Sequence, residues 1–588
     1  MNILGLSFDY HDAAAAIVVN GEIIAAAEEE RFSRKKHDSS LPKLSMAFCL
    51  EEAGISASDL DAIIFYEKPL MKFSRIIASS FKTIPFNTSF ASEALENWIK
   101  KGKFRTKERI YAELEIKDIP YVEIEHHLSH AASAYYTSPF QESTIVTLDG
   151  LGEYETATVS LGKQQKIKKL YSVKLPHSIG LFYSAFTAFL GFEVNEGEYK
   201  VMGMAGFGEA IYVDKIRELY TLEKNGTFRF NQKHFNFSTP SKDHLSKSFI
   251  SIFGESRTPE SHFTPPGFET AETPTEVIKS SKYYADIAAS IQMCTEEIIM
   301  YFVEKAVERT GIKNVCLAGG VALNSAANGR IIREKDFNMY IHPSAGDAGG
   351  ALGAALHYYH HTLSNKRTPA LTAPYLGKSY KNSEIEQALK RAGLDNWELA
   401  PSKHSIVETT AKHLSQGKVI GWLQGRFEWG PRALGNRSIL ADPSNPNMKE
   451  IVNEKIKFRE PFRPFAPSVL EDRAADFFEF PTPYGSASPE YFMLAIAKVR
   501  EQYEKKLPAI THLDRTARIQ LVSRETNELY YSLIKQFCDL TDIPILLNTS
   551  FNLRGEPMVS SPRDAVKTFS WSNMDYLVME NYIVAKSV

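Results

Sequence analysis

Short apolar runs alternate with amphipathic segments along the chain, a pattern typical of mixed α/β proteins. The N-terminal run NILGLSF predicts a strand, and two apolar runs joined at Asn20-Gly21 predict a β-hairpin, because this dipeptide favours a tight turn. A second strand–turn–strand pattern covers residues 144–162, with Gly150 and Gly152 at its turn. Because a unit of this kind begins each of two separate parts of the chain, the pattern predicts a duplicated α/β core.

The pattern also indicates where helices, loops and domains lie. Apolar positions at three- and four-residue spacing predict a long helix over residues 281–311. Segment 235–275 is rich in Ser, Thr and Pro, which predicts a long surface loop. The periodicity stops at residues 361–380, which are polar and contain two prolines. We interpret this stretch as a linker between two domains, residues 1–365 and 366–588.

The composition excludes several classes of protein. The chain has 588 residues and a net charge of −3, so no basic excess favours nucleic acid or an anionic membrane as a partner. It contains no run of 18 apolar residues and begins without a basic n-region, so we expect no membrane span or signal peptide. The four cysteines show no CxxC spacing, which favours reduced thiols and a cytoplasmic location. The sequence leaves open whether the chain forms a homodimer.

A candidate metal site is indicated by EHHLSHAASAYY, residues 125–136. His126 and His130 are four residues apart, so a helix would place both imidazoles on one face. Asp347 lies in a Gly/Ala-rich turn that leads into a helix, where its carboxylate could complete a two-His, one-carboxylate site. The alternatives are that the histidines only pack or cap, and that Asp347 is the N-cap of its helix.

Three glycine-rich stretches predict a nucleotide site, because backbone amides without a neighbouring Cβ can approach phosphate or ribose closely. They are LDGLGE (148–153), EGEYKVMGMAGFG (196–208) and LAGGVALNS (317–325). Each one alone is also explained by ordinary turn geometry. The candidate nucleotide-binding residues are Asp149, Gly150, Gly152, Glu198, Lys200, Gly203, Gly319, Gly320 and Asn324.

Basic residues separated by Gly, Pro and aromatic residues distinguish the second domain. GRFEWGPRALGNRSIL and NEKIKFREPFRPFAPS place arginines in rigid turns, which suits bidentate phosphate recognition, and no GxxxxGK[ST] loop is present. Polar residues in LLNTSFN could complete a polyphosphate site; the alternative is a solvated basic surface. The candidate residues for this polyphosphate site are Arg432, Lys457, Arg463, Arg518, Asn548, Ser550 and Asn552.

These motifs, with HDAAAA, AEEERFSRKKH, SAGDAGGALGAAL and TARIQ, run in one order over almost the whole chain. In this the chain resembles the O-carbamoyltransferases typified by the nodulation-factor, cephalosporin and tobramycin enzymes. The resemblance implies an N-terminal actin/sugar-kinase/Hsp70-like domain, similar to the threonylcarbamoyl transferases that modify tRNA. It also implies a C-terminal α/β domain similar to threonylcarbamoyl-adenylate synthase.

The resemblance further implies the chemistry. The C-terminal domain would convert Mg-ATP and carbamoyl phosphate into carbamoyl-adenylate, and the N-terminal domain would transfer the carbamoyl group to a hydroxyl of a small-molecule acceptor. His126, His130 and Asp347 would hold a metal, usually iron(II), although these ligands also suit zinc. His11 is a candidate base, Asp9 could orient it or contact the acceptor, and Lys36 would be a cation at the acceptor or carbamoyl site.

Other functions stay open at this point. A kinase of the same fold would not need the His-x-x-x-His pair or the arginine-rich domain. A hydrogenase-maturation carbamoyltransferase would carry CxxC modules, which are absent here. A tRNA-modifying enzyme of the threonylcarbamoyl type and a non-catalytic nucleotide sensor are the remaining alternatives.

Overall fold

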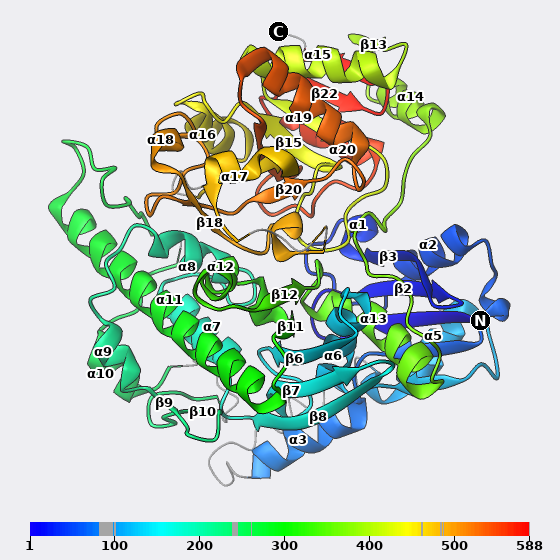
Figure 1. Ribbon diagram of the computed structural model, residues 1–588, viewed down its shortest axis with the longest axis vertical. Helices are drawn as coiled ribbons and strands as arrows, with labels where there is room; N and C mark the ends of the chain where they lie inside the picture. Colours follow the sequence, from blue (N-terminus) through cyan, green and yellow to red (C-terminus); the bar gives the residue numbers. More distant parts are fainter. Residues whose placement is uncertain are drawn as a thin grey trace.

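The computed structural model comprises a lower N-terminal domain and an upper C-terminal domain in the orientation of Figure 1. It describes residues 1–81, 98, 102–237, 245–259, 261–459, 463–481, 485 and 487–586. The apolar runs of the sequence form the buried strands, and the amphipathic segments form helices that cover them.

Two five-stranded sheets with the same topology form the N-terminal domain. In each sheet a strand pairs antiparallel with the next strand, which pairs antiparallel with a third, while two later strands extend the other side in parallel. The first sheet has the order β3-β2-β1-β4-β5, formed by β1 (Asn2–Ser7), β2 (Ala14–Val19), β3 (Glu22–Glu28), β4 (Ala62–Phe65) and β5 (Tyr121–Glu123). The second has the order β12-β11-β6-β7-β8, formed by β6 (Glu142–Leu148), β7 (Glu155–Lys163), β8 (Lys166–Lys174), β11 (Asn314–Ala318) and β12 (Asn338–Ile341).

This repeat confirms the duplicated core and the predicted actin/sugar-kinase/Hsp70 fold class. Both predicted hairpins are present: β2 and β3 meet at Asn20-Gly21, where both residues have positive φ, and β6 pairs with β7 across the glycine turn.

Two short helices pack against each other between the sheets and connect them (Figure 1). Helix α13 (Asp347–Leu356) lies on β1 and β2, and helix α6 (His126–Thr137) lies on β6 and β11. The helices approach so closely that a Cβ on Gly353 would lie 1.9 Å from the backbone oxygen of Ser129. The Gly/Ala-rich composition of α13 is therefore required by packing, and it brings the start of α13 close to the start of α6.

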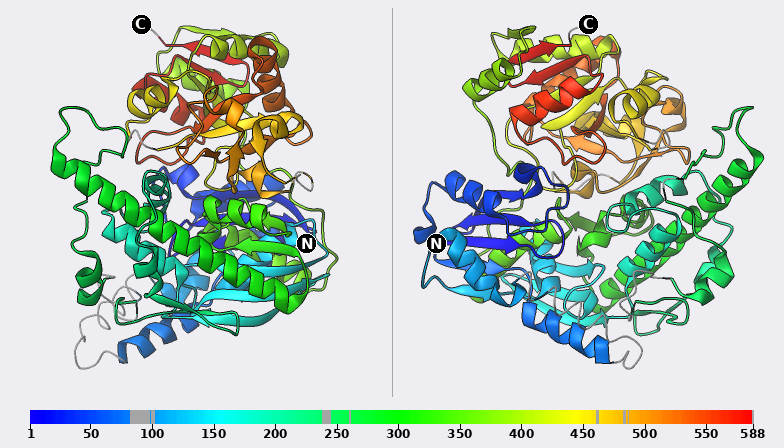
Figure 2. Two further views of the ribbon diagram at one scale, coloured as in Figure 1. Left: turned by 60° about the vertical axis from the view of Figure 1, so that its left-hand side comes forward. Right: turned by 180° about the vertical axis from the view of Figure 1, so that it is seen from behind.

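Further helices surround the second sheet (Figures 1 and 2). They are α7 (Ile179–Phe189), α8 (Glu198–Ala205), α10 (Lys247–Phe253), α11 (Thr275–Thr310) and α12 (Ser325–Glu334). Helix α11 confirms the predicted long helix but begins at Thr275. The expected loop at 235–275 is only partly correct, because α10 lies within it and buries Phe249 and Phe253. Residues 238–244 and 260 of that segment lie outside the described residues.

The C-terminal domain is built on an eight-stranded mixed sheet, β13-β23-β22-β14-β15-β21-β16-β20. Its strands are β13 (Trp397–Leu399), β14 (Ile420–Leu423), β15 (Arg437–Ala441), β16 (Ala466–Leu470), β20 (Gln520–Val522), β21 (Ile545–Ser550), β22 (Tyr576–Met579) and β23 (Tyr582–Ala585). The helices α14 (Asn382–Arg391), α15 (Lys403–Ser415), α19 (Glu528–Thr541) and α20 (Pro562–Trp571) pack around it.

The segment between the domains is packed rather than free. Residues 363–381 form no helix or strand, and the interpretation of this stretch as a domain linker stays a prediction. Leu371 donates its backbone N–H to the Thr137 carbonyl, and Ala26 donates to Leu376. The Pro374 carbonyl accepts a hydrogen bond from the backbone N–H of Trp429 in the C-terminal domain. The linker thus contacts both domains.

Among the described residues, no helix combines the length and the apolar character needed to cross a bilayer.

Candidate functional site

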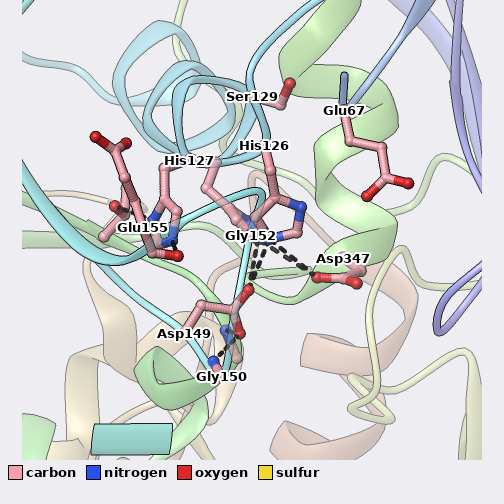
Figure 3. Close-up of polar contacts among 12 residues, drawn as sticks. Glu67, His126, His127, Ser129, Asp149, Gly150, Gly152, Glu155 and Asp347 are labelled. Atoms are coloured by element: carbon pink, nitrogen blue, oxygen red, sulfur yellow. Dashed lines mark hydrogen bonds and ion pairs between the residues drawn. The ribbon is translucent and has the colours of Figure 1, made fainter. Parts of the chain in front are cut away.

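Two imidazoles and two carboxylates meet where α6, α13 and the end of β6 converge (Figure 3). The His126 Nε2 atom lies 3.1 Å from His130 Nε2 and 2.8 Å from Asp149 Oδ2. Asp347 Oδ1 lies 3.7 Å from His126 Nε2 and 3.5 Å from His130 Nε2. The i, i+4 spacing in α6 therefore places both rings on one face, as expected, and the start of α13 delivers Asp347 to them.

The electrostatic environment of this cluster favours positive charge on the imidazoles. Burial opposes the charged form of His130, but Asp149 and Asp347 outweigh it and raise its pKa to about 9. The pKa of Asp149 is held well below its usual range, because the two imidazoles outweigh the effect of burial. Protons on the imidazoles thus balance two buried carboxylates, and a divalent cation could take the same place.

The surrounding residues fix the ligand geometry. His127, the neighbour on α6, faces away: its Nε2–H donates to the Glu155 carbonyl at 2.9 Å, and burial lowers its pKa to about 3. Asp347 is the first residue of α13, and its side chain makes no capping hydrogen bond, so the alternative role as N-cap is not realised. Its Oδ2 atom is buried with no hydrogen-bond partner among the described residues.

Asp149 was expected at a nucleotide but lies within the histidine–carboxylate cluster. Its other oxygen, Oδ1, accepts the backbone N–H groups of Gly150 at 2.8 Å and Gly320 at 3.2 Å. It directly follows β6, whose residues after Glu142 are all buried, and it contacts His126 of α6. Asp149 therefore joins the cluster to two of the three glycine-rich stretches.

The other predicted nucleotide-binding residues are spread more widely. Gly152 turns the β6–β7 connection, and a Cβ there would lie 3.0 Å from the His126 and His127 rings. Gly319 brings its backbone against Leu148, where a Cβ would lie 2.2 Å from the Leu148 oxygen. Gly203, on α8, lies beside Pro464 of the C-terminal domain.

Three polar members of that set make contacts within the protein. Glu198 accepts hydrogen bonds from Ser184 Oγ at 2.8 Å and the Asn195 N–H at 3.0 Å. Asn324 caps α12 through the Ala327 N–H and pairs with Gln292, so its amide is engaged rather than directed at a ligand as predicted.

Lys200, the third polar residue of the predicted nucleotide-binding set, is partly buried. Its ammonium group lies 5.6 Å from the centre of the Phe192 ring.

A second titratable cluster lies in the first sheet's loops and contains His11. The Nδ1 atom of His11 lies 2.8 Å from Asp12 Oδ2, and the Nδ1 atom of His37 lies 2.8 Å from Asp12 Oδ1. Asp9 does not orient His11, because its carboxylate is bound by Arg109 at 2.6 and 3.1 Å. The carboxylate that sequence reasoning missed is Asp12, which directly follows His11 in the HDAAAA motif.

The charge of the His11 imidazole also bears on its predicted role as a base. Burial disfavours the imidazolium, but the Asp12 carboxylate outweighs this and raises the pKa of His11 to about 9. A base must be unprotonated before it accepts a proton, and the role of His11 as a base stays a prediction. Lys36, next to His37, makes an ion pair with Glu196.

Four arginines, Arg432, Arg459, Arg463 and Arg518, gather in the C-terminal domain, facing α8. The charges of Arg432, Arg459 and Arg463 add to burial in lowering the pKa of Arg518 far below its usual range. The Nε atoms of Arg432 and Arg518 are buried with no hydrogen-bond partner among the described residues. Burial also lowers the pKa of Arg432 to about 10. Clustered guanidinium groups of this kind form a site for an anion.

Lys457, Ser550 and Asn552 meet next to the arginines, and their role in binding a ligand stays a prediction. The Lys457 ammonium donates to the Ser550 and Asn552 carbonyls at 2.7 and 2.8 Å, and to Asn552 Oδ1 at 2.7 Å. Burial, followed by Arg459 and Arg463, lowers its pKa, and Lys36 of the N-terminal domain contributes to the shift. Lys36 therefore acts electrostatically on Lys457, while its ammonium group pairs with Glu196.

Asn548, which the sequence suggested as a ligand contact, makes its hydrogen bonds inside the C-terminal sheet. Its amide nitrogen donates to Ser468 Oγ at 2.9 Å, Gln520 Oε1 at 3.0 Å and the Ala433 carbonyl at 3.2 Å, inside the sheet. Because Ala433 follows Arg432, Asn548 positions the arginine loop.

The two sites are joined through Gly430. Its N–H donates to Glu28 Oε1 at 2.9 Å, and its carbonyl accepts from Arg31 Nη2 at 2.6 Å. Its φ is +111°, and a Cβ there would lie 2.4 Å from the Pro343 oxygen. Gly430 thus rests on the loop that leads into Asp347, two residues before Arg432. Arg463 also crosses the junction, 4.8 Å above the ring of Tyr199 on α8.

Fold and site together define a two-domain α/β protein of the actin and sugar-kinase class, with a candidate metal centre in one domain and a cluster of arginines in the other. Residues 2–356 match the family "Carbamoyltransferase N-terminus", and residues 411–586 match "Carbamoyltransferase C-terminus". The chain therefore belongs to the carbamoyltransferase family and is an enzyme of the transferase class.

Three relatives are similar to this chain over most of its length. An uncharacterized protein of Synechocystis, sll1178, is 44% identical over 100% of this chain and 97% of its own length. Nodulation protein NolNO of Sinorhizobium fredii is 36% identical over 98% of this chain and 79% of its own. Nodulation protein U of Rhizobium tropici is 27% identical over 100% of this chain and 96% of its own.

Proposed function

We propose that this chain is an ATP-dependent O-carbamoyltransferase with two successive sites. Residues 366–588 form carbamoyl-adenylate from Mg-ATP and carbamoyl phosphate, and residues 1–365 transfer the carbamoyl group to a hydroxyl of a small molecule. The observation that carries the proposal is that one chain contains two sites that favour ligands of opposite charge. The N-terminal cluster is rich in carboxylates and suits a cation, whereas the C-terminal cluster brings several arginines together and suits phosphates.

The arginine cluster supplies what adenylate formation requires. Pyrophosphate leaves ATP with several negative charges, and carbamoyl phosphate brings two more. Guanidinium groups that already lie close together stabilise such charge without reorganising during the reaction. Lys457, held by Ser550 and Asn552, adds an ammonium group at the same site.

The histidine–carboxylate cluster fits a divalent metal, with four candidate ligands: His126, His130, Asp149 and Asp347. Their ligand atoms lie within 4.8 Å of one another. The unpaired Asp347 Oδ2 is consistent with a ligand in this position. Two imidazoles with carboxylates suit iron(II), which we propose, and also zinc. A bound metal would supply Lewis-acid polarisation of the carbamoyl or phosphate oxygen.

The junction favours direct passage of the intermediate. Carbamoyl-adenylate is a mixed anhydride, so water must be kept away between its formation and its use. Gly430 touches the loop of Asp347, and Arg463 lies over the ring of Tyr199 on α8, so elements of both domains meet beside the two sites. We propose that the intermediate crosses there, with its adenosine beside the glycine-rich stretches.

Pyrophosphate release tests the proposal. The purified chain is incubated with Mg-ATP, with and without carbamoyl phosphate, in the absence of an acceptor. We expect pyrophosphate only when carbamoyl phosphate is present. Formation of ADP, as by a kinase, or nucleotide binding without turnover, as by a sensor, would contradict the proposal.

A further inference from the structure

We propose that Glu28 and Arg31 of the N-terminal domain are positioning residues that fix the place of Arg432 in the C-terminal arginine cluster. The inference rests on the proposed function and adds that one domain completes the site at which the other forms carbamoyl-adenylate. Arg432 lies on the loop of residues 424–436, which connects β14 to β15. The first half of this β14–β15 loop is bound by the N-terminal domain, and its second half is bound within the C-terminal domain.

The first half of the β14–β15 loop packs into the N-terminal domain. The Arg426 Nη2 atom donates to the Ile24 carbonyl at 2.9 Å. The Phe427 ring is fully buried, and its centre lies 5.9 Å from that of Phe32 and 6.2 Å from that of Phe48. Because a C-terminal side chain is inserted among N-terminal aromatic rings, the position of this half is set by the N-terminal domain.

Glu28 and Arg31 hold both backbone polar groups of Gly430, at the end of that half. Glu28 Oε1 accepts the Gly430 N–H at 2.9 Å, and Arg31 Nη2 donates to its carbonyl at 2.6 Å. Arg31 Nε also donates to Glu28 Oε2 at 3.3 Å, and the two side chains are only 2% and 8% exposed. Burying an ion pair adds little net stability, so this pair is better explained by the geometry that it imposes on Gly430.

The second half of the β14–β15 loop is fixed from the C-terminal side. Gln520 on β20 donates from Nε2 to the Leu434 carbonyl at 2.9 Å, and Asn527 donates from Nδ2 to Asn436 Oδ1 at 2.9 Å. Glu428, which is fully buried, ties the two halves together, because its Oε1 atom accepts the N–H groups of Leu434 and Asn436 at 2.8 Å. The short span that carries Arg432 therefore runs between anchors in different domains.

This arrangement makes the place of Arg432 depend on Gly430. Two residues separate them, and so short a span cannot absorb a displacement of Gly430 before it reaches the Arg432 backbone. The Arg432 Nε atom is buried with no hydrogen-bond partner among the described residues, so no hydrogen bond at that atom holds the side chain in place. Charge stabilisation requires donors that are already in position, and a misplacement of about 1 Å can cost about 100-fold in rate.

Arg333 provides a matched control for simple docking of the two domains. It lies on α12, and its Nη1 atom donates at 2.8 Å to the carbonyl of Ile496, which directly precedes β18 (Ala497–Val499) in the C-terminal domain. Arg31 and Arg333 thus each donate from a guanidinium group to a backbone carbonyl across the junction, but at different segments. Docking alone predicts similar effects of Arg31→Met and Arg333→Met, whereas positioning predicts that Arg31→Met acts through Arg432.

A double-mutant cycle on the full chain tests the inference. Carbamoyl-phosphate-dependent pyrophosphate release is measured against ATP and carbamoyl phosphate concentration for the parent, Arg31→Met, Arg432→Met and the double variant. We expect Arg31→Met to lower kcat/KM by about 10- to 100-fold. The double variant should be no slower than Arg432→Met, because a positioning residue has no effect once the side chain that it positions is absent. Arg333→Met should keep a kcat/KM close to that of the parent.

Glu28 is tested by a conservative pair of variants in the same assay. Glu28→Gln keeps a side-chain oxygen that can accept the Gly430 N–H, whereas Glu28→Ala removes it. We therefore expect Glu28→Gln to retain more of the parental kcat/KM than Glu28→Ala. Equal losses in the two variants would overturn the role given to Glu28.

The assay separates the possible failures. If the parent releases no pyrophosphate with carbamoyl phosphate, the proposed function is wrong and this inference falls with it. If release occurs but the losses of Arg31→Met and Arg432→Met multiply in the double variant, Arg31 acts independently and the inference alone is overturned. An equal loss in Arg333→Met and Arg31→Met also overturns it. Should Arg31→Met fail to fold, Arg31→Lys, which keeps a positive charge opposite Glu28, takes its place in the cycle.

Discussion

Replacing Arg518 with methionine should separate binding from stability. The Arg518 side chain is partly exposed, its Nε atom has no hydrogen-bond partner among the described residues, and its charged neighbours are arginines. Removing its charge relieves repulsion, so the free energy of unfolding should stay constant or rise by about 1 kcal/mol. Carbamoyl-phosphate-dependent pyrophosphate release should fall about 10²- to 10³-fold, the usual loss for one charge-stabilising donor.

Arg437→Met provides the matched control. Arg437 is fully buried and donates to backbone carbonyls, among them Gln424 at 2.7 Å and Asn436 at 2.9 Å. Its loss leaves buried carbonyls unpaired and should lower the free energy of unfolding by more than about 3 kcal/mol. Urea denaturation and a coupled pyrophosphate assay measure both effects. If Arg518→Met unfolds as easily as Arg437→Met, or keeps the parental rate, the anion-site reasoning is wrong.

Three further outcomes follow from the two sites and their junction. His130→Ala and Asp149→Ala should each lower bound metal, measured by mass spectrometry, while pyrophosphate release continues; full metal content in Asp149→Ala would exclude it as a ligand. Gly430→Ala, which forces a Cβ against the Pro343 oxygen, should release carbamoyl-adenylate, detected as hydroxyurea with a hydroxylamine trap; parental trapping would remove Gly430 from the passage. Separately expressed 1–365 and 370–588, when mixed, should lose most carbamoyl groups to the trap, and efficient transfer would indicate diffusion through solvent.

Local sequence patterns were sufficient for most of the fold. The Asn20-Gly21 turn, the strand alternation and the helical spacing each depend on neighbouring residues, so the two hairpins and α11 could be predicted. The loop expected at 235–275 was partly wrong, because the polar composition of the segment hid Phe249 and Phe253, whose burial depends on partners such as Phe186 elsewhere in the chain.

The candidate sites were predictable where spacing on one element decides the geometry. His126 and His130 share a helix face, so their proximity follows from four residues of sequence. The place of Asp149 could not be predicted, because it depends on how the end of β6 meets α6. A signal was present, since Asp149 directly follows an almost fully buried strand. Asp12 was missed for the same reason: its contact with His37 joins two separate loops.

Asn548 shows the opposite error. A polar residue at a strand end suggested a ligand contact, but its amide is used to hold the loop of Arg432 from inside the sheet. Sequence alone does not distinguish a side chain that binds a ligand from one that positions such a side chain, because both are polar and adjoin the same motif.

Direct detection of the intermediate tests the central claim, that one chain makes and uses carbamoyl-adenylate. The full chain is mixed with ATP labelled at its α-phosphorus and carbamoyl phosphate labelled at carbon, without acceptor, and the reaction is quenched within milliseconds to seconds. The account predicts an enzyme-bound species that carries both labels in a one-to-one ratio and decays to AMP. Labelled ADP, or AMP formed without any species that carries the carbon label, would contradict it.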